Sequence, residues 1–300
     1  MFKGSLVALI TPYKNNFIDE RALEKLVEWH IAEGTHGIVA CGSTGEGALL
    51  TREEQRRILE ICANTAARRI PVIANVSAVR LEDALSLAHQ AQNTEGIQGL
   101  MLTPPPYIKP TQEAICQFIK TVHDETELPI IMYNNPGRCG VDMSRETIVH
   151  LAKLPRIAGL KDSSGDVRRV SEQAALVPSS FVQLCGEDGL NVPFMAQGGH
   201  GWISVTANAA PRLCVQIYES WRQGDLKTFA RLRDFLDPLH KAIVSETNPA
   251  PIKYAVARQG FCSDEVRRPL VKATVVARKA VDQALQHAGI LAVSQKDRHG

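Results

Sequence analysis

Short apolar segments bounded by Gly and Pro recur along the first two thirds of the chain. Each is the length of a β-strand, and most are apolar throughout, which is typical of parallel strands covered on both faces. Eight segments are therefore expected to be strands: Gly4–Ile10, Gly37–Cys41, Pro71–Val76, Gly99–Thr103, Pro129–Asn134, Ile157–Asp162, Phe181–Cys185 and Gly201–Ser204.

Amphipathic segments lie between these strands. In the first of them, Leu23, Leu26 and Ile31 fall on one stripe, as on a helix that packs by one face. Thr51 and Glu54 have the spacing of a capping box, which predicts a helix start. Helices are expected over Asp19–Glu33, Thr51–Arg68, Leu81–Gln92, Thr111–Asp124, Ser144–Lys153, Val167–Val177 and Asp188–Gln197.

Regular alternation of strand and helix predicts an α/β protein with a (β/α)8 TIM barrel. A doubly wound open sheet is the structural alternative. After Pro211 no strand pattern returns, and a C-terminal helical appendage is expected over Leu213–Gln223, Leu226–Leu239, Pro251–Gln259 and Val266–Ala288. We expect a catalytic barrel over residues 1–224, a helical region over 225–293 and a polar tail over 294–300.

The composition narrows the classes of function. Among 300 residues, 44% are hydrophobic and 22% charged, and the net charge of +2 gives no overall attraction to nucleic acid or an anionic membrane. No apolar stretch reaches the roughly 18–20 residues of a membrane span. The first residues enter a strand-like run, so we expect no signal peptide.

Cysteine and histidine spacing argues against disulfides and metal sites. The seven cysteines stand singly without a CxxC motif, which favours reduced thiols in a cytoplasmic protein. The nine histidines show no HxH or HxxxH spacing, so we expect no metal.

Lys161 is the most informative residue at the predicted strand ends, where the active site of such a barrel gathers. It follows the apolar residues Ile157–Leu160. An apolar setting opposes the charged ammonium and frees an amine that can condense with a ketone or aldehyde. The alternative, from the pattern alone, is a lysine that simply reaches solvent.

Other strand ends carry groups that suit a small keto acid. The loop Gly42–Gly47 (GSTGEG) offers backbone N–H groups and two hydroxyls to an anion, although a tight turn alone could require its glycines. Tyr107 and Tyr133 could relay protons or be core aromatics. Arg138 could bind a carboxylate or be a solvated surface residue.

Taken together, these segments resemble the dihydrodipicolinate synthase family of pyruvate-dependent class I aldolases, whose superfamily includes N-acetylneuraminate lyase. The matching motifs cover nearly the whole chain: Phe2–Ser5, Thr11-Pro12, the Gly-Ser-Thr-Gly-Glu loop, Tyr133-Asn134 with Pro136–Arg138, Gly159–Lys161, Gly198–Asn208, and Asn248-Pro249 with Pro251 and Lys253. Single motifs are weak, but this many in register are specific.

The resemblance implies a mechanism. Lys161 would form an imine with pyruvate, Ser43 and Thr44 would hold its carboxylate, and Tyr133 would be the general acid and base. The resemblance places Tyr107 in the proton relay of a neighbouring subunit's site and assigns the carboxylate of L-aspartate 4-semialdehyde to Arg138. It adds Gly45, Gly186 and Ile203 to the substrate-binding residues.

The implied reaction is the condensation of pyruvate with the semialdehyde to 4-hydroxy-tetrahydrodipicolinate, a lyase-class step of diaminopimelate and lysine biosynthesis. No cofactor is expected beyond the covalent imine on Lys161. The implied assembly is a tight dimer, commonly paired into a homotetramer, in the cytoplasm. Alternatives are a sibling aldolase acting on N-acetylneuraminate, 4-hydroxy-2-oxoglutarate or a 2-keto-3-deoxysugar, and a non-catalytic barrel that binds a keto acid.

Several positions depart from the family pattern. Ser43-Thr44 replaces a usual Thr-Thr pair, and Asn75-Val76-Ser77 replaces a usual Gly-Thr-Gly near the site. The positions that resemble the family's lysine-inhibition pocket are Gly47, Arg52, Gln55, Val79, Asp83 and Pro106. Because Val79 and Pro106 offer no polar side chain and Arg52 repels a cation, we predict weak or no inhibition by lysine.

Overall fold

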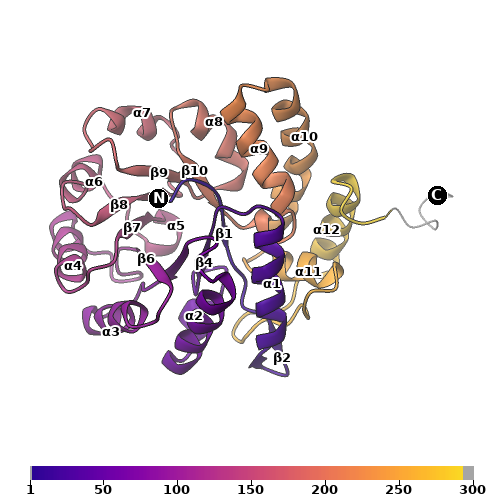
Figure 1. Ribbon diagram of the computed structural model, residues 1–300, viewed down its shortest axis with the longest axis horizontal. Coiled ribbons are helices and arrows are strands. Elements are labelled where there is room, and N and C mark those ends of the chain that lie inside the picture. Colours follow the sequence, from indigo (N-terminus) through magenta and orange to yellow (C-terminus); the bar gives the residue numbers. More distant parts are fainter. Residues whose placement is uncertain (1, 293–300) are drawn as a thin grey trace.

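Eight parallel strands close into a barrel with helices around it in the computed structural model, which describes residues 2–292 (Figure 1). The order around the barrel is β1-β10-β9-β8-β7-β6-β5-β4. These strands are β1 (Gly4–Ala8), β4 (Gly37–Ala40), β5 (Val72–Asn75), β6 (Ile97–Leu102), β7 (Ile130–Asn134), β8 (Ile157–Asp162), β9 (Val182–Cys185) and β10 (Gly201–Ser204). The predicted barrel is confirmed, and the open sheet is excluded.

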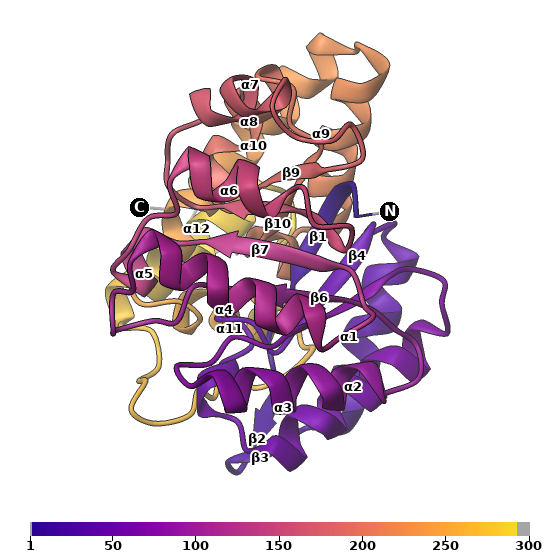
Figure 2. The same ribbon diagram turned by 90° about the vertical axis from the view of Figure 1, so that its left-hand side faces the viewer.

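Each gap between successive barrel strands holds at least one helix. They are α1 (Glu20–Ala32), α2 (Arg52–Ala66), α3 (Leu81–Gln92), α4 (Gln112–Asp124), α5 (Pro136–Cys139), α6 (Arg145–Leu151), α7 (Arg168–Ala174) and α8 (Asn191–Ala196). The capping box at Thr51 and Glu54 is present at the start of α2, as the spacing predicts. Figure 2 views the molecule from the side of α4 and α6, with β7 running behind them.

Alternation along the strands builds two apolar layers. Residues that face outward pack under the helices, for example Ile38, Leu100 and Met132. Residues that face inward fill the barrel, and Phe2 and Tyr133 belong to this inner cluster. Because the interior is filled with side chains, the polar groups that face inward near the strand ends are held against a packed floor.

The C-terminal region is helical, as expected, with α9 (Pro211–Gln223), α10 (Leu226–Ile243), α11 (Ala250–Arg258) and α12 (Val275–His287). The prediction of a helix from Val266 is wrong, because α12 begins only at Val275, with Thr274 as its N-cap. Pro269 has no N–H for a helical turn, and it disfavours helical geometry at the residue before it. The division at residue 224 stays a prediction, and the polar tail lies outside the described residues.

Short elements were not expected. A hairpin of β2 (Tyr13–Lys14) and β3 (Phe17–Ile18) turns through Asn15 and Asn16, both with positive φ, as its tight turn requires. Three single turns of 3₁₀-helix follow strand ends: η1 (Gly47–Leu49), η2 (Asp188–Leu190) and η3 (Thr206–Asn208). Over residues 2–292, no helix is long and apolar enough to span a membrane.

Candidate active site

A cavity of about 150 Å³ opens at the carboxyl ends of the barrel strands. Six residues predicted from the sequence line it: Ser43, Thr44, Tyr133, Arg138, Lys161 and Gly186. A larger cavity, of about 510 Å³, lies outside the barrel between α8, α9 and α10. We assign the chemistry to the smaller cavity, because it collects a buried amine, a phenol and hydroxyls at the strand ends.

Lys161 and Tyr133 face each other inside the barrel. They are direct partners in the register of β7 and β8, so their side chains point to the same side. Both residues are only 5% exposed. The Lys161 Nζ lies 4.1 Å from the centre of the Tyr133 ring. An amine and a phenol are thus held together where little water reaches them.

Polar and charged neighbours lower the pKa of the Tyr133 hydroxyl. Burial raises its pKa, but the positive charge of Lys161, the nearby Ser163 and Asn135 side chains and the charge of Arg138 outweigh burial and lower it overall. Asn135 Nδ2 donates to the Tyr133 Oη at 2.7 Å. A phenol with a lowered pKa gives up and takes back a proton more readily near neutral pH.

The Gly-Ser-Thr-Gly-Glu loop reaches the cavity through its two hydroxyl residues. Ser43 is exposed, whereas Thr44 is buried and accepts a hydrogen bond at 3.0 Å from the Nδ2 of Asn248. The Gly45 carbonyl accepts from the Thr11 hydroxyl at 2.7 Å, which fixes the loop against the barrel. Gly45 itself is buried and does not line the cavity.

A buried ion pair supports this loop from behind. Glu46 and Lys253 pair with neither side chain exposed, and the Lys253 Nζ also donates to the Glu265 carbonyl at 2.7 Å. Burial lowers the pKa of Lys253, and the attraction to Glu46 offsets this only in part. Lys253 is the second buried lysine near the site, but it does not line the cavity.

Arg138 lies on the short helix α5, directly after β7. Its side chain is exposed, and within residues 2–292 it has no ion-pair partner, so it is free to meet an anion. Glu187 lines the same cavity. Burial raises the pKa of the Glu187 carboxyl, and the nearby Ser163 hydroxyl and Lys161 charge oppose this only partly.

Gly186 makes room for the lysine. A Cβ at this position would lie 2.0 Å from the Ser163 Oγ and 3.1 Å from the Lys161 Cε, so a larger residue would push into the site. Ile203 belongs to the inner apolar cluster under Tyr133 and does not line the cavity. Tyr107 lies outside the cavity and is 88% exposed.

Sequence reasoning gave no site role to several residues that line the cavity, among them the polar residues Asn135, Glu187 and Asn248. Asn135 and Glu187 directly follow β7 and β9, so their position at strand ends was an available signal. Asn248 comes from beyond α10; it stands in the matching Asn248-Pro249 motif, but the sequence gave no reason to place it beside the loop. Within the part of the chain that is described, no group of three or more His, Cys, Asp or Glu side chains is placed to hold a metal ion.

Comparison with known proteins agrees with the resemblance seen in the motifs. The model of the dihydrodipicolinate synthetase family matches residues 1–288. The chain belongs to this family. A relative named 4-hydroxy-tetrahydrodipicolinate synthase, from Rhodospirillum centenum, is 47% identical over 291 residues, which cover 97% of this chain and 100% of the relative.

Solved structures of this family have the same fold. The dihydrodipicolinate synthase of Acinetobacter baumannii, solved with pyruvate, is 37% identical with a TM-score of 0.93, over 97% of this chain and 100% of that one. The enzyme of Cyanidioschyzon merolae, solved with lysine bound, is 28% identical with a TM-score of 0.93, over 97% and 99%. The predicted family and the predicted lyase class are confirmed.

Proposed function

We propose that this chain condenses pyruvate with L-aspartate 4-semialdehyde to 4-hydroxy-tetrahydrodipicolinate through an imine on Lys161. The carrying observation is a buried Lys161 whose Nζ faces Tyr133 in the cavity at the strand ends. The reaction predicted from the sequence is the one that gives the relatives their name, and at that level the prediction is confirmed. The roles of single residues stay predictions.

In the proposed reaction, the neutral Lys161 amine attacks the keto carbon of pyruvate, and water leaves as the imine forms. Loss of a methyl proton gives an enamine, whose carbon attacks the aldehyde and forms the new carbon–carbon bond. The amine of the joined acceptor then displaces Lys161 as the ring closes, which frees the enzyme. The chain needs no dissociable cofactor for these steps.

Proton transfers in this scheme pass through Tyr133. Its lowered pKa and its burial beside Lys161 support this role. The Thr44 hydroxyl accepts its hydrogen bond from Asn248 and keeps its own proton to donate. Ser43 and Thr44 both remain candidates for the relay and for holding the pyruvate carboxylate.

The acceptor site is assigned to Arg138, whose guanidinium would bind the semialdehyde carboxylate with two charge-assisted hydrogen bonds. We assign Gly186, the Gly45 backbone and the Ile203 carbonyl to the substrate surroundings. We assign Tyr107 to the relay of a neighbouring subunit, since it is exposed and does not line the cavity of its own chain. The proposed assembly is a tight dimer paired into a homotetramer in the cytoplasm.

The aldehyde that reacts with the pyruvate enamine distinguishes the proposed activity from that of a sibling aldolase. Turnover of pyruvate with aspartate semialdehyde is measured in a coupled assay, beside cleavage of N-acetylneuraminate, 4-hydroxy-2-oxoglutarate and a 2-keto-3-deoxysugar acid. The proposal predicts the highest kcat/KM with the semialdehyde. A higher value for one of the cleavage substrates would assign the chain to that activity, and pyruvate binding without any turnover would indicate a keto-acid sensor.

A further inference from the structure

The outer face of β7 and β8 carries a polar network directly behind the catalytic pair. Asn134 and Asp162 follow Tyr133 and Lys161 in register, so they point away from the cavity. The Asn134 Nδ2 donates to the Asp162 Oδ1 at 3.0 Å and to the Asp142 Oδ1 at 2.8 Å. One buried amide therefore holds two carboxylates close together.

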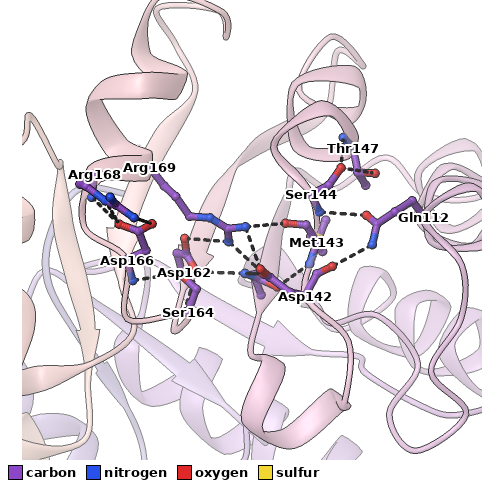
Figure 3. Close-up of polar contacts among 11 residues, drawn as sticks. Gln112, Asp142, Met143, Ser144, Thr147, Asp162, Ser164, Asp166, Arg168 and Arg169 are labelled. Carbon is purple, nitrogen blue, oxygen red and sulfur yellow. Dashed lines mark hydrogen bonds and ion pairs between the residues drawn. The ribbon is translucent and has the colours of Figure 1, made fainter.

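Arg169 of α7 closes this network (Figure 3). Its guanidinium donates to both oxygens of Asp142 at 2.9 Å and to the Met143 carbonyl at 3.1 Å, and it lies 3.7 Å from the Asp162 Oδ2. The Arg169 side chain is 15% exposed. Burial lowers its pKa, but the contact with Asp142 and the carboxylate charges around it raise the pKa overall.

The network ties together the two ends of the segment that carries Arg138. This segment leaves β7 after Asn134 and returns at Asp142, and the Asn134 Oδ1 accepts from the Met143 N–H at 3.0 Å. Gln112 of α4 holds the same return point, because its Nε2 donates to the Asp142 carbonyl at 2.8 Å. Side chains from three elements thus fix where the Arg138 segment begins and ends.

The β7–β8 pairing itself does not depend on Arg169. Backbone hydrogen bonds already hold it, including one from the Ser163 N–H to the Asn134 carbonyl at 2.8 Å. Without the guanidinium, Asp142 and Asp162 would repel each other across one amide. Asp162 belongs to a strand, so the loop residue Asp142 is the one that can move.

We propose that Arg169 is a positioning residue for binding of the semialdehyde. It neutralises Asp142 and Asp162 and so holds the segment that carries Arg138 in place. This inference rests on the proposed function of Lys161 and Arg138. The proposal predicts different effects on the binding of the two substrates. Pyruvate binding, by Lys161 and the Ser43-Thr44 loop, is independent of Arg169, whereas semialdehyde binding depends on it.

The test compares Arg169→Met with a matched control, Arg168→Met, on the same helix. Arg168 pairs with Asp166 at the surface, and its side chain is 75% exposed. For Arg169→Met we expect the KM for the semialdehyde to rise about tenfold or more, since small displacements of a binding group are costly. The KM for pyruvate and the rate of borohydride trapping should stay within about twofold of wild type, since the imine step is untouched.

Arg169→Lys should bring the semialdehyde KM part of the way back to the wild-type value. It restores the positive charge but not the paired N–H donors of the guanidinium. Equal changes in both KM values, or none, would overturn the proposal. If Arg169→Met does not fold, Arg169→Gln is measured in the same way and should also raise only the semialdehyde KM; an unchanged value there would overturn the proposal. Wild type that neither traps pyruvate nor turns over the semialdehyde would instead refute the proposed function.

Discussion

Lys161 and Tyr133 lie in surroundings that differ from those of most lysines and tyrosines. Many lysines and tyrosines reach solvent, but these two are only 5% exposed. The Lys161 Nζ lies 4.1 Å from the centre of the Tyr133 ring. Hydrophobic neighbours exclude water, and the few polar groups that remain act in a weakly screening medium. We infer that any reactivity of this site comes from where the barrel places ordinary side chains.

Replacing Tyr133 tests the acid and base role directly. Tyr133→Phe keeps the ring that packs against Lys161 and removes only the hydroxyl. We expect turnover to fall by about 10²–10⁴-fold, the usual range for a positioned acid or base. Steady-state rates measured beside circular dichroism check this, and a folded variant with wild-type turnover would show that another group moves the proton.

Site residues at the ends of strands could be predicted from the sequence, but the residues that support them from other strands could not. Lys161, Tyr133 and Arg138 follow apolar runs that the sequence displays. Asn75 was noted only as a departure from the family pattern. In the structure its Nδ2 donates to the Cys41 carbonyl at 3.1 Å, just before the Gly-Ser-Thr-Gly-Glu loop. Such a contact spans two strands, and no local period encodes it.

Among the elements, long periodic segments were predicted well and short ones were not. The barrel strands are continuous apolar runs bounded by turns, and the helices α1 to α4 have clear apolar periods. Helix α5 and the β2–β3 hairpin are too short to show a period. The false extension of α12 to Val266 came from ignoring Pro269, which cannot donate to a helical turn.

One element carries a pH dependence of stability. His30 in the last turn of α1 is fully buried, and burial lowers its pKa from 6.5 to about 3. Between these two values the unfolded chain binds a proton that the folded chain does not. Stability from this group is therefore complete above about pH 6.5 and is lost as the pH falls toward 3.

For His30→Gln we expect the free energy of unfolding to fall less steeply between pH 6 and pH 4.5, by up to about 1.4 kcal/mol per pH unit. Urea unfolding at several pH values measures this slope. His150→Gln, at an exposed position on α6, is the matched control and should leave the slope as in wild type. Identical slopes for wild type and His30→Gln would contradict the assignment.

For the whole molecule, the position of Tyr107 predicts a shared active site. Its side chain is 88% exposed, although a neighbouring subunit would cover it. Tyr107→Phe and Lys161→Ala homo-oligomers should each lose activity. When the two variants are mixed and subunits exchange, some sites regain a wild-type Lys161 and a wild-type Tyr107. Restored activity is the expected result, and its absence after verified exchange would place Tyr107 in its own subunit's site or outside any site.

Regulation is predicted to differ from that of a lysine-inhibited relative. The Arg52 guanidinium pairs with Asp83 and contacts the Ser86 hydroxyl, so the one carboxylate at the resembling positions is already engaged. The Gln55 amide is likewise bound to the Gly47 carbonyl at 2.9 Å. We expect little or no inhibition by millimolar lysine in initial-rate assays. Strong inhibition, with lysine bound between subunits at these residues, would refute this.

The central claim is that the Lys161 amine forms the imine with pyruvate. Borohydride reduction in the presence of pyruvate, followed by mass spectrometry of peptides, tests it most directly, since the chain holds a second buried lysine, Lys253, near the site. The expected result is one reduced pyruvate adduct per chain, on the peptide that contains Lys161, and none in Lys161→Ala. Undiminished trapping in that variant, or an adduct on Lys253, would contradict the account.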